Sequence, residues 1–195
     1  TDLTAQIVWD YAVNSNLNIK MVHEYRPGVS IAKNTGAKIA IGDVILFLDA
    51  DNTIKESFLL SLDAYINKEN CTAGTIRTIP DNKNIKSVFV FTILEIIKIT
   101  FPKPFGKSFV NKEVFNESGG YDENVVLGEN VFFLQKVKKS FAGTNRKFGH
   151  FTLGLKCSIR RFEKEGYLKV LFQWFIAYLG NQNLDYKTMF HIDGD

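Results

Sequence analysis

Residues 42–54 read Gly-Asp-Val-Ile-Leu-Phe-Leu-Asp-Ala-Asp-Asn-Thr-Ile, and this stretch decides the class of fold. The apolar run 44–48, bounded by turn formers, predicts a strand that is buried on both faces, as in parallel α/β sheets. The strand ends in Asp49 and Asp51, with only Ala50 between them. Ligands of such sheets bind beyond the carboxyl ends of the strands, where two carboxylates suit a divalent cation that carries a diphosphate. The alternative is that both aspartates only form a turn or cap the next helix.

The segment before this strand, residues 27–40, has the pattern of a helix that begins after a Pro-Gly turn. Ser30 is the residue expected to cap its N-terminus. Two rows of side chains recur at helical spacing, namely Ile31, Thr35 and Ile39, and the small residues Ala32, Gly36 and Ala40. The small row predicts a helix that lies close against the sheet.

A second series of short segments follows farther along the chain. Residues 105–115 read Phe-Gly-Lys-Ser-Phe-Val-Asn-Lys-Glu-Val-Phe, and residues 118–123 read Ser-Gly-Gly-Tyr-Asp-Glu. Glu129 and Asn130 then stand at the start of a predicted helix. Its apolar row consists of Val131, Leu134, Val137 and Phe141.

In this order, the segments resemble the family 2 glycosyltransferases of the GT-A fold. The pattern of that family is Gly-x-Ser-x-Ala-Arg-Asn-x-Gly, a short helix, Gly-Asp, an apolar strand and Asp-x-Asp. An acceptor-side segment with Gly-Gly-Phe-Asp-Glu follows, and then Glu-Asp opens a helix. The chain departs from this pattern at Lys33 (arginine in the family), Tyr121 (phenylalanine) and Asn130 (aspartate). Residues 158–167 resemble the later Ser-x-Arg-Arg segment, so the likeness covers roughly residues 1–167.

The resemblance implies an α/β fold of the GT-A, Rossmann-like kind: a mostly parallel sheet flanked by helices, with C-terminal amphipathic helices. We expect a glycosyltransferase domain over residues 1–165 and a C-terminal helical extension over residues 166–195. Residues 1–4 resemble the end of the motif that follows the family's second strand, and residues 5–14 the helix after it. We therefore expect the sequence to be a fragment of a longer chain; a protein that truly began at Thr1 would bind nucleotide weakly or not at all.

The resemblance also implies a reaction: inverting transfer of a sugar from a nucleotide-diphosphate donor to an acceptor hydroxyl, with Mg²⁺ or Mn²⁺ as cofactor. Asp51 is the expected metal ligand, and Asp49 is expected to face the ribose or the water shell of the metal. Lys33 and Asn34 are expected on the donor side.

Two arginines near the end of the resemblance have two interpretations. Arg160 and Arg161 could clamp the donor phosphate or an acidic acceptor, since guanidinium groups pair well with phosphate. Alternatively they form structural ion pairs with Glu163 or Glu165.

The catalytic base is the point at which the chain departs most from the family. The family implies the aspartate of Glu-Asp as base, and Asn130 stands there instead; an amide does not take up a proton at physiological pH. Glu129 is the favoured base, with Asn130 orienting the acceptor, and Asp122 is a third candidate. The alternatives are a catalytically impaired binding or assembly module and, less favoured because of the Gly-Gly-Tyr-Asp-Glu block, a sugar nucleotidyltransferase.

Composition limits the number of domains, the kinds of partner and the cellular setting that fit this sequence. The 195 residues, 45% hydrophobic and 23% charged, fit a single globular domain. A net charge of +3 gives no support for a nucleic-acid partner. Cys71 and Cys157 are far apart and lack metal spacing, which predicts free thiols and a cytoplasmic setting.

Two apolar segments raise the question of a membrane. Residues 85–101 carry Lys86, Glu95 and Lys98 and are too short to span a bilayer. Residues 166–179 are rich in aromatic residues and would pack on the domain or on a partner, a second copy included, or lie in a bilayer interface. The expected partners are therefore a nucleotide-sugar donor and a saccharide or lipid-linked acceptor, with peripheral contact at the inner face of the cell membrane as an option.

Overall fold

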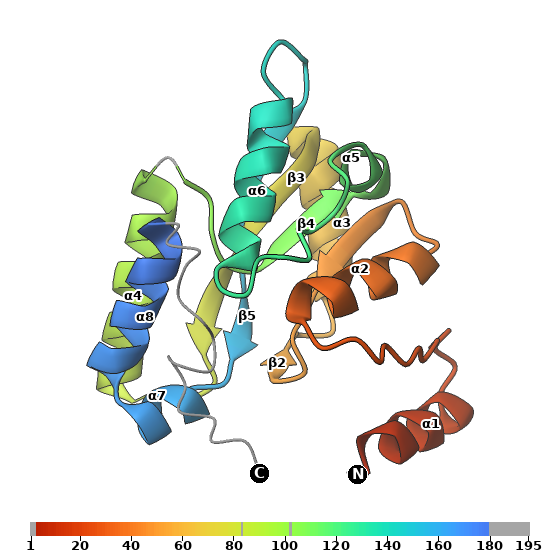
Figure 1. Cartoon of the computed structure of the whole chain (residues 1–195), viewed down its shortest axis with the longest axis horizontal. Coiled ribbons are helices and arrows are strands. Elements are labelled where there is room, and N and C mark those ends of the chain that lie inside the picture. The colour runs from red at the N-terminus through yellow and green to blue at the C-terminus, as the bar shows by residue number, and fades with distance from the viewer. Residues whose placement is uncertain (1–2, 83, 102, 180–195) are drawn as a thin grey trace.

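The computed structural model describes residues 3–82, 84–101 and 103–179, which form a central sheet with helices on both faces (Figure 1). The strands are β1 (Val44–Phe47), β2 (Asn52–Thr53), β3 (Cys71–Pro80), β4 (Ser108–Asn111) and β5 (Lys147–Cys157). The helices are α1 (Thr4–Asn14), α2 (Val29–Ile39), α3 (Phe58–Glu69), α4 (Ile85–Thr100), α5 (Lys112–Glu117), α6 (Glu129–Ser140), α7 (Arg160–Glu165) and α8 (Tyr167–Leu179). The expected α/β class is confirmed.

The sheet has the order β1-β4-β3-β5-β2 and is mixed. Strands β1, β3 and β5 run in one direction, whereas β4 and β2 run in the other, so that β3–β5 is the one parallel pair in the described sheet. The expectation of a mostly parallel sheet is corrected in this respect. An apolar run shows that both faces of a strand are covered, but it carries no information about the direction of the neighbouring strands.

Each face of the sheet is covered by its own helices. Residues 45, 73 and 110 point toward α2, α5 and α6, with which they form one apolar cluster. Residues 76, 109 and 155 point to the opposite face, where α3 contributes Phe58 and Leu62. Because successive strand residues alternate between the faces, the apolar run of β1 contributes to both clusters, as its sequence predicts.

Helix α2 turns a different face toward the core than its small residues predict. Ser30, Asn34 and Ala37 are buried, whereas Ala32 and Gly36 are exposed. The predicted cap is also wrong, because α2 begins at Val29 and the buried Ser30 hydroxyl donates instead to the carbonyl oxygen of Val125, 3.4 Å away. Contacts with the distant segment that follows α5 therefore decide which face is buried.

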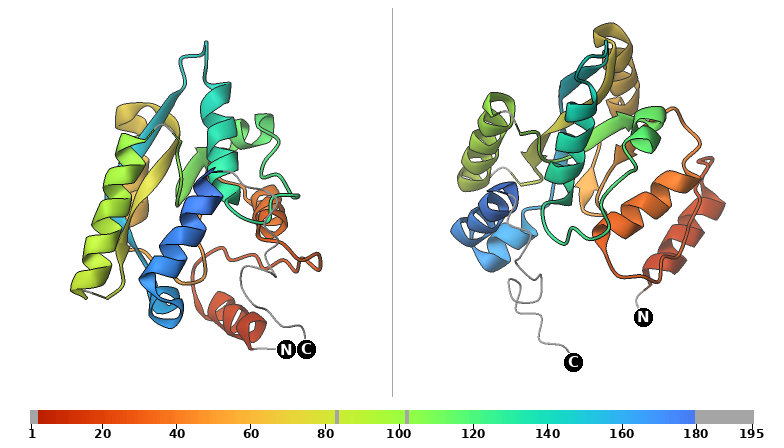
Figure 2. Two further views of the ribbon diagram at one scale, coloured as in Figure 1. Left: turned by 60° about the vertical axis from the view of Figure 1, so that its left-hand side comes forward. Right: turned by 45° about the horizontal axis from the view of Figure 1, so that its top comes forward.

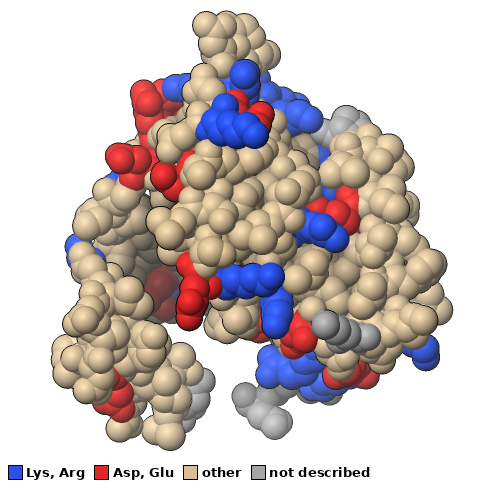
Figure 3. Space-filling view, turned by 180° about the vertical axis from the view of Figure 1, so that it is seen from behind, with Lys and Arg blue, Asp and Glu red and all other residues tan. Residues whose placement is uncertain are grey.

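Helix α4 lies beside α7 and α8, away from the other helices (Figures 1 and 2). Phe91 of α4 packs with Phe162 and Val170 in a third apolar cluster. The outward side of α4 is nevertheless apolar, with Ile85, Val88, Phe89, Ile93, Ile96 and Ile99 all exposed. Seen from behind, the side of the molecule over α4 is largely free of charged groups (Figure 3). Among the described residues no helix is long and apolar enough to cross a membrane.

Helix α1, where a helix over residues 5–14 is expected, stands apart from the sheet and buries no residue (Figure 1). Ile7 and Tyr11 are exposed although the sequence pattern places them on one apolar face.

Candidate active site

The candidate site lies at the edge of the sheet where β1, β3 and β5 end. Asp49 and Asp51 follow β1 directly, and Lys107 immediately precedes β4, which starts at the same edge because it runs antiparallel to β1. Cys157, the last residue of β5, pairs in register with Asn52. The mixed sheet therefore brings segments from four strands to the place where the sequence predicts ligand binding.

The Asp-Ala-Asp segment forms a tight turn whose carboxylates remain at the surface. The backbone N–H of Asn52 donates to the carbonyl oxygen of Asp49 at 3.0 Å, and the Asn52 side chain accepts from the Asp49 N–H at 3.0 Å. Asp51 accepts one bond from the Asn52 amide at 3.0 Å. The turn interpretation is thus correct for the backbone, whereas the helix-cap interpretation is wrong, since α3 begins only at Phe58.

Lys107 and Cys157 surround these acids. The Lys107 ammonium group forms an ion pair with the Asp49 carboxylate. Burial raises the pKa of the Cys157 thiol to about 11, with Lys107 acting in the opposite direction and Asp51 and Asp49 adding to the rise. The Asn52 amide donates to Asp51 at 3.0 Å and to Sγ of Cys157 at 3.5 Å, so the thiol lies beside the turn.

The donor set is compatible with a divalent cation that is bound jointly by protein and substrate. Among the described residues no three or more His, Cys, Asp or Glu side chains gather in a metal-binding cluster. Asp49 and Asp51 supply two exposed carboxylates instead. Mg²⁺ in particular is usually held by one or two carboxylates together with substrate phosphates and water, so the two aspartates fit such an ion.

The second half of the site is built around Lys33 of α2 and the first residues of α6. The Lys33 Nζ lies 2.8 Å from Oε1 of Glu129 and 2.9 Å from Oδ1 of Asn130. The Tyr121 hydroxyl donates to the same Asn130 oxygen at 3.0 Å. Since a lysine donates only, Oδ1 of Asn130 must face Lys33, and the amide NH₂ points the other way. The residue predicted on the donor side, Lys33, is thus bound to the proposed base.

Tyr121 connects the two halves. Its ring packs on Phe47, the last residue of β1, with centroids 5.1 Å apart, and the Lys33 ammonium lies 5.0 Å from the ring centroid. Burial raises the pKa of the Tyr121 hydroxyl well above its usual range, and the negative charges of Glu129 and Asp49 add to the rise. Through these contacts the Tyr121 side chain links the end of β1 to the start of α6.

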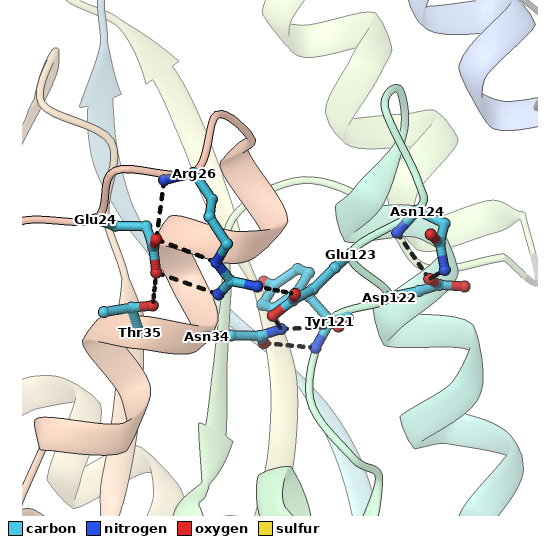
Figure 4. A network of polar contacts seen from close by, with 8 residues as sticks. All are labelled: Glu24, Arg26, Asn34, Thr35, Tyr121, Asp122, Glu123 and Asn124. Carbon is cyan, nitrogen blue, oxygen red and sulfur yellow. Dashed lines mark hydrogen bonds and ion pairs between the residues drawn. The ribbon is translucent and has the colours of Figure 1, made fainter.

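Asn34 holds the loop that carries Tyr121 (Figure 4). Its amide donates to the Tyr121 carbonyl oxygen and accepts from the Tyr121 N–H, each at 2.9 Å. Beside it, Arg26 bridges Glu24 and Glu123 (Figure 4). Asn34 is 8% exposed, so its role in this structure is to fix the loop from within.

Asp122 and the two arginines lie outside this constellation. The exposed Asp122 carboxylate accepts from the backbone and side-chain nitrogens of Asn124 at 2.9 and 3.2 Å, the arrangement of a side chain that holds its own turn (Figure 4). Arg161 donates to Glu165 at 3.0 Å and to Gln173 at 2.7 Å, which supports the structural ion-pair interpretation for this residue. Arg160 is exposed.

Two cavities lie elsewhere in the fold. One of about 570 Å³ opens between α4 and the start of α8, and one of about 200 Å³ is lined by Thr75, Lys98 and His150 among others. Neither of these two cavities is lined by the aspartates that follow β1 or by Glu129. The sequence analysis missed Lys107 and the connecting role of Tyr121, because the antiparallel pairing of β4 with β1 that brings Lys107 to Asp49 is not visible in the local sequence.

Comparison with known families identifies the family of this chain. The family model described as glycosyl transferase family 2 matches residues 1–124. This chain belongs to glycosyl transferase family 2. A comparison with curated protein sequences finds no match.

Solved structures of S. aureus TarS share the fold. The TarS structure itself is 17% identical with a TM-score of 0.58, and the match covers 97% of this chain and 34% of that one. The 1–349 form in complex with UDP-GlcNAc is 18% identical with a TM-score of 0.59, and the match covers 97% of this chain and 57% of that one. The same form in complex with UDP is 18% identical with a TM-score of 0.58 and coverages of 97% and 56%. The chain thus spans about a third of TarS and a little over half of its 1–349 form.

Proposed function

We propose that the protein transfers a sugar from a nucleoside-diphosphate donor to an acceptor hydroxyl, with a divalent cation and with inversion at the anomeric carbon. The observation that carries this proposal is that Tyr121 packs between the two motifs: its ring contacts Phe47, two residues before Asp49, and its hydroxyl donates to Asn130, next to Glu129. A donor-side acid pair and an acceptor-side carboxylate in one site are what a single displacement needs. Family membership supplies the reaction class.

On the donor side, Asp51 is the proposed metal ligand, and Asp49 is its partner toward the ribose or the water shell of the ion. A bound Mg²⁺ or Mn²⁺ would neutralise charge on the diphosphate as it leaves. Both carboxylates are exposed at the end of β1, where such a group can reach them.

On the acceptor side, we assign Glu129 as the general base. Its Oε1 is paired with Lys33, which leaves Oε2 as the oxygen that would accept the proton of the acceptor hydroxyl. Oδ1 of Asn130 accepts from Lys33 and Tyr121, which leaves its NH₂ as the group that would donate to the acceptor. Asp122 is the weaker candidate because its carboxylate holds the turn with Asn124.

A uridine nucleotide is the first donor to test, because the TarS structures of the same fold are complexes with UDP-GlcNAc and UDP. The nature of the sugar and of the saccharide or lipid-linked acceptor is left to a substrate panel.

The test is hydrolysis and transfer from a panel of sugar nucleotides, with and without Mn²⁺. Wild-type protein should release nucleoside diphosphate in a metal-dependent manner, and Asp51→Ala should lower the rate by about a hundredfold, as expected for the loss of a metal ligand. Asp63→Ala, an exposed aspartate on α3, is the matched control and should leave the rate unchanged. Equal rates for the wild-type protein and Asp51→Ala would contradict the proposal.

The second candidate is a catalytically impaired binding or assembly module, and Asn130 in the place of the family's aspartate favours it. The variant Asn130→Asp separates the two. If Glu129 is the base, the variant should change the transfer rate by less than about tenfold, whereas a rise of a hundredfold or more would show that the wild-type protein lacks its base.

We also propose a cytoplasmic location with peripheral contact at an anionic bilayer, supported by the free thiols and by the apolar outward sides of α4 and α8. Phe89 and Leu168 line the groove between these helices together with Lys86, Lys169 and Glu165, so apolar surface lies next to two lysines, of which Lys169 is 3.6 Å from a Glu165 oxygen.

Co-sedimentation with phosphatidylglycerol vesicles tests this contact. Wild-type protein should pellet, and the double variant Phe89→Asp with Leu168→Asp should not. Equal pelleting of both proteins would contradict membrane contact. If the wild-type protein instead stays unbound and forms a dimer that the double variant abolishes, the surface is an interface between two copies.

A further inference from the structure

Lys107 is held in a fixed position beside the Asp-Ala-Asp turn. It is the last residue before β4, and its carbonyl oxygen accepts from the N–H of Ile76 at 2.9 Å, which anchors its backbone to β3. Its side chain is 15% exposed, whereas that of its partner Asp49 is 47% exposed. The lysine therefore approaches the carboxylate from the protein side and leaves the outer side of Asp49 open to solvent.

The other lysines of this region have different partners. Lys33 is bonded to Glu129 and Asn130, and the buried Lys98 is bonded to Glu95 and to the carbonyl oxygen of Ile76. Within the described part of the chain, Lys107 is the lysine that forms an ion pair with the acids after β1. It supplies a positive charge where Asp49 and Asp51 would otherwise repel one another.

We propose that Lys107 is a donor-site residue with two successive partners: Asp49 in the free protein, and the donor diphosphate once a divalent cation occupies the aspartates. The inference rests on the proposed function and adds a residue to its donor site. A cation held at the two aspartates would repel the ammonium group, and the flexible stem of the Lys107 side chain would let its three N–H donors turn toward a nearby phosphate. Charge-assisted bonds to the diphosphate would then stabilise it in the bound donor and as it leaves.

This exchange predicts opposite effects on two ligands. Removing the charge with Lys107→Met should strengthen the binding of Mn²⁺ alone by about threefold, because the cation no longer has to displace the ammonium group from Asp49. The same variant should weaken the binding of UDP at saturating Mn²⁺ by about tenfold, because a charged hydrogen bond to phosphate is lost. Titration calorimetry with Mn²⁺ alone, and then with UDP, measures both dissociation constants.

Two further variants control the experiment. Lys103→Met removes a lysine from the same loop, whose ammonium group lies over the Tyr178 ring at 5.4 Å, and should leave both constants unchanged. Lys107→Arg keeps the charge and should retain UDP binding within about threefold. It also covers the case in which Lys107→Met does not fold.

The outcomes are distinct. A tightened Mn²⁺ constant together with a weakened UDP constant supports the exchange. Unchanged constants in Lys107→Met, or a parallel weakening of both, would overturn it and would assign the lysine a structural role. If wild-type protein binds neither UDP nor any other nucleoside diphosphate with Mn²⁺, the proposed function itself fails, which is a result that the variant comparison cannot produce.

Discussion

Nζ of Lys33 lies 2.8 Å from Oε1 of Glu129, and this contact joins the helix that precedes the Asp-Ala-Asp strand to the helix that carries the proposed base. The two residues are 96 positions apart in the chain. Their side chains are 12% and 18% exposed, so the pair is largely shielded from solvent. Lys33, at the position where this family usually has arginine, therefore holds the first residue of α6 in place.

Replacing Lys33 with methionine should destabilise the protein. The change leaves Glu129 without its ion-pair partner and removes one of the two donors to Asn130, at a cost of about 1–3 kcal/mol in the free energy of unfolding. Urea denaturation followed by tryptophan fluorescence measures this quantity. Lys38→Met, an exposed lysine on the same helix, is the control and should change stability by less than about 0.5 kcal/mol. Equal stabilities for the two variants would show that the Lys33 pair contributes nothing.

Glu129→Gln should lower the rate of sugar transfer by a factor of about 10²–10⁴ while UDP binding stays the same. Glutamine keeps the oxygen that accepts from Lys33 but does not take up a proton. Single-turnover transfer and calorimetric titration of UDP separate the two quantities. Asp122→Asn is the comparison, and it should retain most of the rate because Asp122 holds a turn. A Glu129→Gln protein with wild-type transfer rates would remove Glu129 from the mechanism.

The adjacent glycines 119 and 120 provide a test of how tightly the Tyr121 loop is held. Both have positive φ, +72° and +67°, so alanine at either position costs about 1–2 kcal/mol for the left-handed conformation. A Cβ at Gly119 meets nothing within 4 Å, whereas one at Gly120 would lie 2.7 Å from Oδ1 of Asn34 and 3.0 Å from Phe115. Gly120→Ala should therefore be less stable than Gly119→Ala by about 1–3 kcal/mol in urea denaturation. Equal losses would mean that Asn34 can move away from the loop.

The network around Glu24 should contribute to the loss of stability in acid. Hydrogen bonds from Arg26 and Thr35 lower the pKa of Glu24 from its ordinary value of 4.5 to about 2. Above pH 4.5 the carboxyl is ionised in the folded and the unfolded chain, and its stabilising contribution is fully present. As the pH falls from 4.5 toward 2, the unfolded chain takes up the proton first, so the contribution is lost.

Melting temperatures of the wild-type protein and Glu24→Gln across this range check the expectation. The difference between the two proteins should be largest at neutral pH and should shrink as the pH approaches 2. A difference in melting temperature that stays constant over the whole pH range would show that Arg26 and Thr35 do not stabilise the ionised form of Glu24.

Elements whose burial is set by local periodicity could be predicted from the sequence. The strand expected over residues 44–48 is β1, and the apolar row 131, 134, 137 and 141 of the predicted helix is buried, the first three in α6 and Phe141 directly after it. Such patterns are reliable because one face of an element meets the core at every turn or every second residue. The ion pair of Arg161 with Glu165 was also foreseen as an alternative, since these residues are four apart on a helix.

What the sequence could not predict depends on partners that are distant in the chain. Ser30 has the residue type of a helix cap, but its hydroxyl bonds to a carbonyl 95 residues away. Asn34 turns inward because it binds the backbone of Tyr121, and this choice moves Ala32 and Gly36 to the surface. Lys107 meets Asp49 across 58 residues through the antiparallel placement of β4, which nothing in its local sequence indicates.

The most direct test of the central claim is calorimetric titration of UDP into the wild-type protein and Asp51→Asn, each with and without Mn²⁺. The account predicts that wild-type protein binds UDP in the presence of Mn²⁺ and at least tenfold more weakly without it. A tenfold change in the dissociation constant is roughly what the loss of one charge-assisted contact costs in binding free energy. Asp51→Asn should bind UDP weakly in both conditions. Binding by wild-type protein that does not depend on Mn²⁺, or equally strong binding by Asp51→Asn, would contradict the assignment of the Asp-Ala-Asp turn as the donor site.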